Sequence, residues 1–220
     1  LMKMGEPGVP ELTAYLEDIL KAGDTLGFDG RVVSVGEGQE YADIAEKKGA
    51  KVAYHDDLID MIWTDRPEMS KAPAFSLGIE YAGESAADKL KRTREEMAKA
   101  GANAHVLTTL DDICWTLNIR GDDIEFFPLL LSYAIIKMDS VELYIDESKL
   151  NDEIKADLAE LNVKIHPYND IYADICKLDA ETVLMLDPGK LNYALYNNIP
   201  ENVKKVEERN FAIRKRLLEY

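Results

Sequence analysis

The residues of this sequence that could do chemistry are three histidines, two cysteines and several paired carboxylates. His55, His105 and His166 lie far apart in the chain, and none has a second histidine or cysteine three or four positions away. Metal centres are usually marked by such short ligand spacings, although long-range ligands also occur. The spacing therefore gives no support to a metal site, and we interpret the three imidazoles as hydrogen-bonded or surface groups.

The cysteines and carboxylates also give no catalytic pattern. Cys114 lies within the apolar run Ile113–Ile119, which we expect to be a core strand, and Cys176 lies in a second apolar segment. Two widely spaced cysteines do not make a disulfide framework, so we expect both to be buried free thiols. Pairing of Cys114 with a histidine as nucleophile and base is conceivable. The carboxylate pairs are interpreted as solvated caps and turns: Asp56-Asp57, Asp111-Asp112 and Asp122-Asp123.

One glycine-rich turn, Gly36-Glu37-Gly38, lies between an expected strand and an expected helix, where phosphate-binding loops occur. It lacks a third glycine at the required spacing, and Glu37 would oppose a phosphate at a helix N-terminus. A tight turn followed by an acidic first helical turn is the favoured interpretation. A nucleotide-binding α/β protein that uses this turn remains an alternative.

Alternating helices and strands must position these residues. Expected helices are Glu11–Ala22, Glu37–Lys48, Asp56–Ile62, Ser85–Ala100, Asp152–Leu161 and Asp170–Lys177. Expected strands are Thr25–Val35, Lys51–Tyr54, Ala104–Thr108, Ile113–Ile119, Tyr133–Met138, Val141–Ile145, Val163–His166 and Thr182–Leu186. Asp139-Ser140 should close an antiparallel hairpin. This order predicts an α/β fold: a mixed β-sheet flanked by helices on both faces.

Composition excludes several classes of function. The 220 residues are 46% hydrophobic, which is sufficient for a core, and the formal net charge is −16. Such an anion repels nucleic acid and an anionic membrane surface, so we expect neither as a partner. No apolar run approaches the roughly 20 residues of a membrane helix, and the N-terminus carries no apolar signal core. We therefore expect a cytoplasmic protein.

Two longer phrases carry a resemblance to a known family. The first is Trp63-Thr64-Asp65-Arg66-Pro67, and the second runs from Thr108 through Asn118-Ile119-Arg120-Gly121 to Ile135. Together they resemble the second domain of three-domain Xaa-Pro aminopeptidases, a creatinase/prolidase N-terminal-type domain. His166-Pro167-Tyr168 resembles a further phrase of that family. Phe126-Phe127 departs from it, since members often carry a polar residue and Asn before the proline.

The resemblance implies three segments. Residues 1–24 would be the end of a preceding domain and a connector, and residues 25–209 the creatinase/prolidase N-terminal-type domain. Residues 210–220 would be a tail or the start of a linker to the catalytic domain. Thr64-Asp65-Arg66 superficially resembles a metal-ligand phrase of the family, but it lacks the second Thr-Arg and fits the non-catalytic phrase.

For function, the resemblance implies a non-catalytic N-terminal domain of a metal-dependent Xaa-Pro aminopeptidase. This domain would cover the active site and aid substrate selection or assembly. Such enzymes remove the residue that precedes proline, and they use two metal ions, usually manganese, in a catalytic domain. We predict no catalytic residue, no metal ligand and no cofactor in this chain. The implied partners are the protein's own catalytic domain, proline-containing peptides and a possible homodimer.

Arg120 is the predicted substrate-proximal residue, because its forked guanidinium could bind carboxylate or carbonyl groups of a substrate or of the catalytic domain. The alternative interpretation is that Arg120 pairs with Asp122, Asp123 or Asp65 and only stabilises its turn. A second function also remains open: a stand-alone binding or dimerisation module whose interface is the Trp63 region.

Overall fold

The computed structural model describes residues 2–208 of the chain. The predicted tail, residues 210–220, lies outside this range. The chain divides into two compact units, which are described separately below. The first runs to Arg66 and includes Asn192–Asn197, and the second contains Pro67–Leu191 and residues 198–208. The segment boundary at residue 25 stays a prediction.

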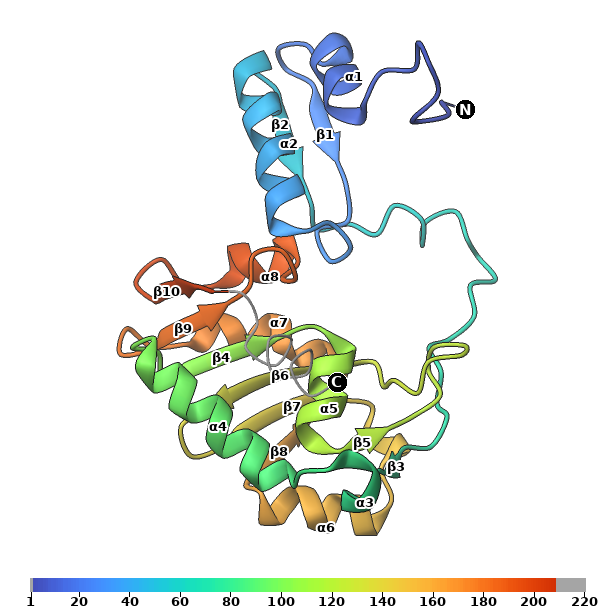
Figure 1. Ribbon diagram of the computed structural model, residues 1–220. Helices are drawn as coiled ribbons and strands as arrows, with labels where there is room; N and C mark the ends of the chain where they lie inside the picture. The colour runs from blue at the N-terminus through green and yellow to red at the C-terminus, as the bar shows by residue number, and fades with distance from the viewer. Residues whose placement is uncertain (1, 209–220) are drawn as a thin grey trace. The chain divides into compact units, whose positions relative to one another are not determined.

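The first unit is a strand–helix–strand element preceded by a short helix (Figure 1). Its elements are α1 (Leu12–Ile19), β1 (Thr25–Gly27), α2 (Val35–Lys48) and β2 (Lys51–Ala53). The strands β1 and β2 pair in parallel, as a βαβ arrangement requires, and Leu16, Leu20 and Ile44 form the apolar core. The expected strand at residues 31–35 is wrong because Ser34 is the N-cap of α2.

The segment after β2 also differs from expectation. The predicted helix Asp56–Ile62 is a series of turns, because the Asp57 carboxylate accepts hydrogen bonds from the backbone N–H groups of Ile59 and Asp60, both at 3.1 Å. Arg66 Nη1 binds the same carboxylate at 2.7 Å. These hydrogen bonds hold the turns at residues 58–63, which we call the apolar knuckle. Its large apolar side chains are all exposed: Leu58, Ile59, Met61, Ile62 and Trp63.

The second unit contains the remaining elements. Its strands are β3 (Phe75–Ser76), β4 (Ala104–Leu107), β5 (Ile119–Arg120), β6 (Ser132–Lys137), β7 (Val141–Ile145), β8 (Val163–His166), β9 (Val183–Leu186) and β10 (Lys204–Glu207). Its helices are α3 (Ile79–Ala82), α4 (Ala86–Lys99), α5 (Leu110–Leu117), α6 (Asp152–Glu160) and α7 (Ile171–Asp174), and the chain leaves it briefly for α8 (Tyr193–Asn198). Short 3-10 turns flank α7, so the predicted helix Asp170–Lys177 is present only in pieces.

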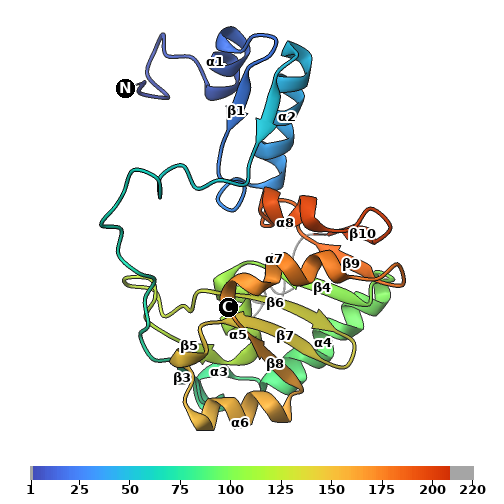
Figure 2. The same ribbon diagram turned by 180° about the vertical axis from the view of Figure 1, so that it is seen from behind.

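A six-stranded sheet of order β10-β9-β4-β6-β7-β8 organises this unit. The strands β6 and β7 form the predicted antiparallel hairpin, whereas β7–β8 and β9–β10 are parallel. Residues of α4, α5 and α6 pack in one core cluster with β6 and β7. Helix α7 lies on the opposite face, where Tyr172 contacts Tyr133 of β6 (Figures 1 and 2). The prediction of a mixed sheet with helices on both faces is confirmed.

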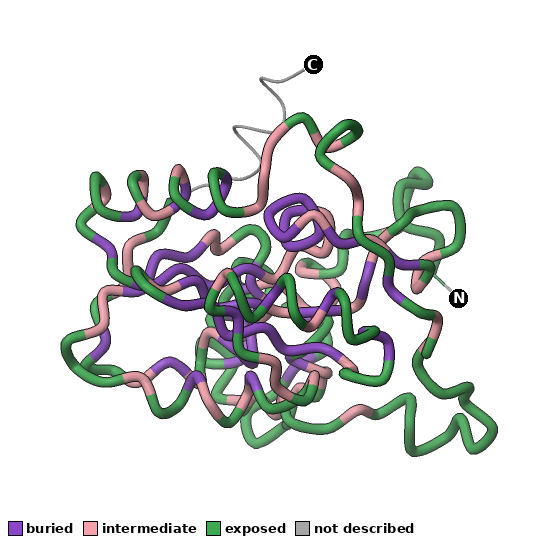
Figure 3. Tube along the Cα trace, turned by 90° about the horizontal axis from the view of Figure 1, so that it is seen from below, coloured by how far each residue is buried: buried purple, intermediate pink, exposed green. Residues whose placement is uncertain are grey.

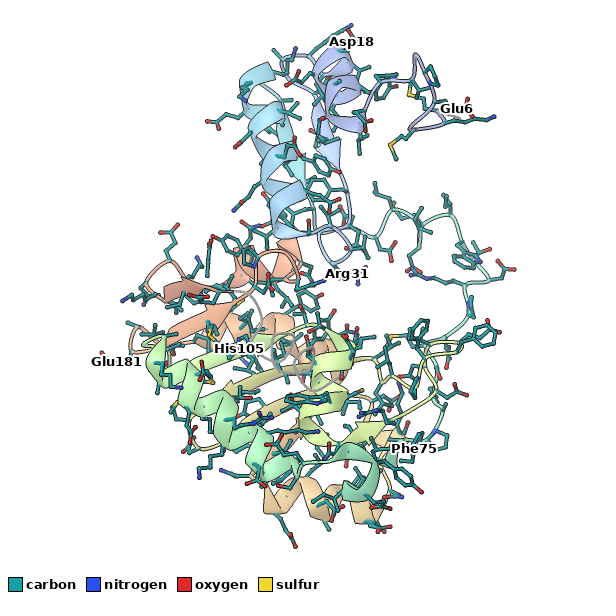
Figure 4. The ribbon with its side chains drawn as sticks, viewed as in Figure 1. Glu6, Asp18, Arg31, Phe75, His105 and Glu181 are labelled. Atoms are coloured by element: carbon teal, nitrogen blue, oxygen red, sulfur yellow. The ribbon has the colours of Figure 1, made fainter. Side chains whose placement is uncertain are left out.

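The central strands are the most buried part of this unit (Figure 3). All five residues of β7 and all four of β4 are buried, including His105 (Figure 4). Among the described residues, no helix is long and apolar enough to cross a membrane.

The expected strand Ile113–Ile119 is wrong, because these residues belong largely to helix α5. Six of the eight α5 residues are buried, including the polar Asp112 and Thr116. Burial is thus not confined to one face, and the sequence shows no clear helical or alternating pattern. Asp111 and Asp112 lie in the first turn of α5, where a helix favours acidic residues. Asn118 ends the helix in a left-handed conformation (φ 53°).

Candidate functional site

The structure places Arg120 directly after helix α5, at the start of a long loop. Asn118 reverses the chain, and Arg120 then pairs with Phe75 in the two-stranded sheet β3–β5. Arg120 Nη1 donates hydrogen bonds to the carbonyl oxygens of Cys114 and Ile119. The last carbonyls of a helix lack intrahelical partners and attract cations. The main chain at the end of α5 therefore holds the guanidinium in place.

Asp123, one of the acids considered as partners of Arg120, forms a buried ion pair with Lys149. Asp123 accepts a hydrogen bond from Lys149 Nζ at 2.6 Å, and both side chains are fully buried. The other Asp123 oxygen, Oδ1, is buried without a hydrogen-bond partner in the structure. The pair Asp123–Lys149 joins the loop after Arg120 to the segment that follows β7.

A cavity of about 800 Å³ opens beside Arg120. Helix α4 and the first turn of α5 contribute three of its five charged lining residues, and the segments before α4 and after α5 contribute the others. The charged lining is Glu84, Lys89, Arg92, Asp111 and Arg120, and Trp115 also lines the cavity. Three cations and two acids therefore line one cavity in a chain whose overall charge is strongly negative. Such a lining favours anionic or carbonyl-bearing ligands over cationic ones.

Trp115 is the lining residue against which two of the cations pack. Lys89 Nζ lies 4.5 Å from the centroid of the indole ring, and the Arg92 guanidinium lies 6.0 Å from it. These are cation–π distances. Lys89 Nζ also donates to the carbonyl oxygen of Trp115 at 3.0 Å and to Asn118 Oδ1 at 2.7 Å, while Arg92 pairs with Glu84. The Trp115 ring and these polar contacts therefore fix the positions of the Lys89 and Arg92 charges.

The sequence pattern had not marked Lys89, Arg92 or Trp115. Lys89 and Arg92 are three residues apart on α4 and therefore share a face of that helix. That spacing was the only available signal, and it does not identify the indole ring against which the two cations pack. Only tertiary packing brings α4 and α5 together at the cavity.

The remaining candidates lie in separate places with partners of their own. His105 Nδ1 contacts the carbonyl oxygen of Met185 at 3.0 Å, His166 Nε2 contacts Glu142 Oε2 at 2.7 Å, and the His55 ring packs on Tyr54. Across residues 2–208, no group of three or more His, Cys, Asp or Glu side chains could hold a metal ion. The described residues therefore do not fit a metal centre.

The two cysteines differ from each other. Cys114 is buried, as expected, and its Sγ accepts a hydrogen bond from the Leu130 N–H at 3.4 Å. Burial raises the pKa of the Cys114 thiol, which keeps it protonated and weakens it as a nucleophile. Cys176 is exposed, so the prediction of two buried thiols is wrong for this residue. It lies in the short 3-10 turn after α7, where Ile175 occupies the buried position instead.

The Gly36-Glu37-Gly38 turn is part of helix α2 and has a structural explanation. Ser34 and Glu37 form a capping box in which each side chain binds the other residue's backbone N–H. A carboxylate of the chain thus already occupies the place a phosphate would take. A Cβ atom on Gly38 would lie 2.2 Å from the Tyr193 ring, so this glycine is required for packing. Both observations argue against a nucleotide site.

This geometry defines an α/β domain with a cavity of mixed charge, and comparison with known proteins identifies its family. Residues 65–216, more than half of the chain, match the Creatinase/Prolidase N-terminal domain family. The chain therefore belongs to the creatinase/prolidase N-terminal domain family.

Several relatives are Xaa-Pro aminopeptidases. The chain is 40% identical over 177 residues to a probable Xaa-Pro aminopeptidase P of Neurospora crassa, covering 79% of this chain and 26% of the relative. It is 33% identical over 215 residues to aminopeptidase P2 of Arabidopsis thaliana, covering 96% of this chain and 30% of that protein.

A solved structure gives the same result. The crystal structure of an X-prolyl aminopeptidase from Caenorhabditis elegans matches with a TM-score of 0.88 at 31% identity, over 96% of this chain and 35% of the other. That protein is described as a cytosolic enzyme with a di-nuclear active site. The chain thus spans between a quarter and slightly over a third of the length of these three proteins.

Proposed function

We propose that this chain is the non-catalytic N-terminal part of a cytoplasmic Xaa-Pro aminopeptidase, which removes the residue that precedes proline from a peptide. Its similarity to aminopeptidases P, over only part of their length, supports this proposal. The proposed parent carries two divalent metal ions, manganese in our prediction, in a catalytic part that supplies the ligands. The metals would activate the water that attacks the peptide bond. The di-nuclear site of the Caenorhabditis elegans relative is consistent with this division.

Within the parent, we assign this domain the role of covering one side of the active-site opening. The cavity lined by Arg120 and Trp115 would face the opening and bind carbonyl or carboxylate groups of the peptide or of the catalytic part. The observation that carries this assignment is the fixed position of Arg120, whose guanidinium is held by two main-chain carbonyls beside a cavity with two further cations. Groups fixed in this way lose little entropy when a substrate binds.

The test is an Arg120→Ala substitution in the polypeptide encoded by the full open reading frame. Hydrolysis of Xaa-Pro peptides is measured with manganese, and kcat and KM are determined separately. We expect KM to rise about tenfold or more, because a hydrogen bond to a charged group contributes about 1.5–3 kcal/mol. The chain of residues 1–220 alone should release no amino acid. Robust metal-dependent release by this chain alone would overturn the assignment.

Arg94→Ala is a matched control. The Arg94 guanidinium also binds two main-chain carbonyls, Lys137 O at 2.9 Å and Ser140 O at 3.2 Å, but it does not line the cavity. Both substitutions should lower the thermal unfolding temperature, and only Arg120→Ala should raise KM. If Arg120→Ala changes stability but leaves KM unchanged, Arg120 has a structural role only.

The apolar knuckle, residues 58–63, favours the alternative function as a binding or dimerisation module. Five large apolar side chains are exposed within six residues, and such clusters often mark protein interaction sites. Light scattering of the chain over a range of concentrations tests this alternative. A concentration-dependent dimer that Ile62→Ser abolishes would support it, whereas a monomer at all concentrations would contradict dimerisation through this knuckle.

A further inference from the structure

The turn at residues 124–127 has an unusual backbone conformation. The Phe127 N–H donates to the Ile124 carbonyl oxygen at 3.0 Å and closes a four-residue turn. Phe126 occupies the third position of this turn with φ +68°. Glycine and asparagine are favoured there because a side chain is strained at positive φ. A bulky aromatic residue is therefore unfavourable for the turn itself.

The exposure of this tip is equally unfavourable. Phe126 is 90% exposed and Phe127 is 59% exposed, so both rings lie largely in water. Neither ring contributes to the apolar core of the unit. Glycine at position 126 would relieve the backbone strain and remove the exposed ring. The stability of the domain therefore does not account for this phenylalanine.

The base of the same loop, in contrast, is firmly held. The Asp123 N–H donates to the Leu129 carbonyl oxygen at 3.1 Å, and the Leu131 N–H donates to Asp123 Oδ2 at 2.7 Å. The buried ammonium of Lys149 binds the same Asp123 oxygen. The loop thus presents two aromatic rings from a rigid base, only a few residues after Arg120. Strain maintained by a rigid surrounding structure is a common feature of binding segments.

The shape and size of the tip restrict its partner. A stable protein interface buries about 800 Å² on each side, and two phenyl rings at the end of a turn supply only part of that. A projecting tip suits an apolar recess, as anchor residues of interfaces do. A peptide substrate presents projecting side chains and therefore has no recess into which the tip could insert. A folded domain with a concave apolar surface is the partner that fits.

We propose that the Phe126–Phe127 tip inserts into an apolar recess of the catalytic part of the same polypeptide and anchors the loop that carries Arg120. This inference rests on the proposed function, in which a catalytic part accompanies this domain. The Caenorhabditis elegans aminopeptidase, of which this chain covers 35%, has ample further chain to provide such a surface. The tip would fix the distance between the Arg120 cavity and the rest of the enzyme.

The test compares thiol labelling beside the tip, at position 125, in two proteins: the chain of residues 1–220 and the full-length polypeptide. Glu125→Cys replaces an exposed residue and leaves both phenyl rings of the tip in place, and labelling of that cysteine is followed by peptide mass spectrometry. We expect labelling at least about tenfold slower in the full-length protein, which corresponds to a docking free energy of about 1.4 kcal/mol. Equal rates would overturn the proposal. Slow labelling in the isolated chain that depends on its concentration would also overturn it, because the partner would then be a second copy.

Met138→Cys is the matched control. Met138 is also an exposed apolar residue, but it follows the C-terminal end of β6, whereas the tip precedes the N-terminal end. A strand of six residues is about 20 Å long, so it separates the two positions. Its labelling rate should be the same in both proteins. Protection of both positions would indicate general burial and would overturn a specific role for the tip.

A second variant separates docking from folding. Phe126→Gly should leave the unfolding temperature of the isolated chain unchanged or raise it, because it removes a strained residue. The same substitution should lower kcat/KM of the full-length enzyme severalfold, and Phe126→Leu should retain more activity than Phe126→Gly. Unchanged kinetics for Phe126→Gly would overturn the inference. Hydrolysis of Xaa-Pro peptides by the unsubstituted full-length protein tests the proposed function separately.

Discussion

Replacing Lys149 by methionine should strongly destabilise the second unit. The side chains of Lys149 and Asp123 are fully buried, and Lys149 Nζ lies 2.6 Å from Asp123 Oδ2. After the substitution, the carboxylate would keep the Leu131 N–H as its donor but would lose its counter-charge. Removal of one partner of a buried ion pair costs about 3–5 kcal/mol, because an uncompensated charge stays buried.

This loss translates into a large change in thermal unfolding. For a chain of this size, each kcal/mol shifts the midpoint by about 2–4 °C, so we expect a decrease of about 6–20 °C. Tryptophan fluorescence reports on the second unit if Trp63→Phe is used as the background, because Trp115 is then the remaining tryptophan. Urea unfolding of the same proteins would give the free energy directly.

Two further variants make the experiment decisive. Lys155→Met removes a lysine whose ion pair with Glu147 (2.8 Å) is largely exposed, and it should cost at most about 1 kcal/mol. The double variant Asp123→Asn/Lys149→Met removes both charges and keeps an acceptor for the Leu131 N–H, so it should recover much of the lost stability. A loss below about 1 kcal/mol for Lys149→Met would refute the reasoning, as would a double variant no more stable than the single one.

Three smaller changes test the packing, capping and pH dependence of the fold. Gly121→Ala should cost about 1–3 kcal/mol in urea unfolding, because its Cβ would lie 2.1 Å from Leu130 Cδ2 in the core. Ser34→Ala removes the N-cap of α2 and should cost about 1 kcal/mol in thermal unfolding. Burial raises the pKa of Glu142, but the hydrogen bonds with His166 and Lys137 and the charges of Lys137 and Lys164 together outweigh it. The net pKa is lowered, so Glu142→Gln should reduce acid destabilisation.

The sign of the pH effect follows from the lowered pKa. A carboxyl with a depressed folded-state pKa stabilises the protein above its unfolded value, about 4.3 for glutamate, and this stabilisation is lost as the pH falls through the folded pKa. Stability of Glu142→Gln should thus vary less below about pH 4.3 than that of the unsubstituted chain. An unchanged acid profile would contradict the assignment.

For the glycine prediction, Gly36→Ala is the control, because a Cβ there meets no atom within 4 Å.

Much of the fold could be predicted because the residues that end its helices act locally in the sequence. Gly49 adopts the left-handed C-cap conformation that ends α2, and Gly101 follows α4 with a positive φ. The failure at Ile113–Ile119 has a physical cause, since burial on all sides removes the periodicity that separates helix from strand. The acidic first turn of α5 was the signal that could have corrected it.

The candidate site was less accessible to prediction. Arg120 was singled out, but its observed partners include backbone carbonyls at the end of α5, which no sequence pattern identifies. Lys89 reaches Trp115 only because α4 packs beside α5. The environment of such groups depends on tertiary packing, and local propensity does not determine it.

The segment Asn192–Asn197 has a consequence for how the chain folds. It belongs to the first unit: Tyr193 N–H donates to the Val33 carbonyl oxygen, Ala194 N–H donates to that of Gly30, and the Tyr193 ring packs against Gly38. During synthesis, the first unit leaves the ribosome long before this segment is made. Contacts this distant in sequence form slowly because a long loop must close first. The N-terminal unit should therefore remain incompletely packed until nearly the whole described chain has been translated.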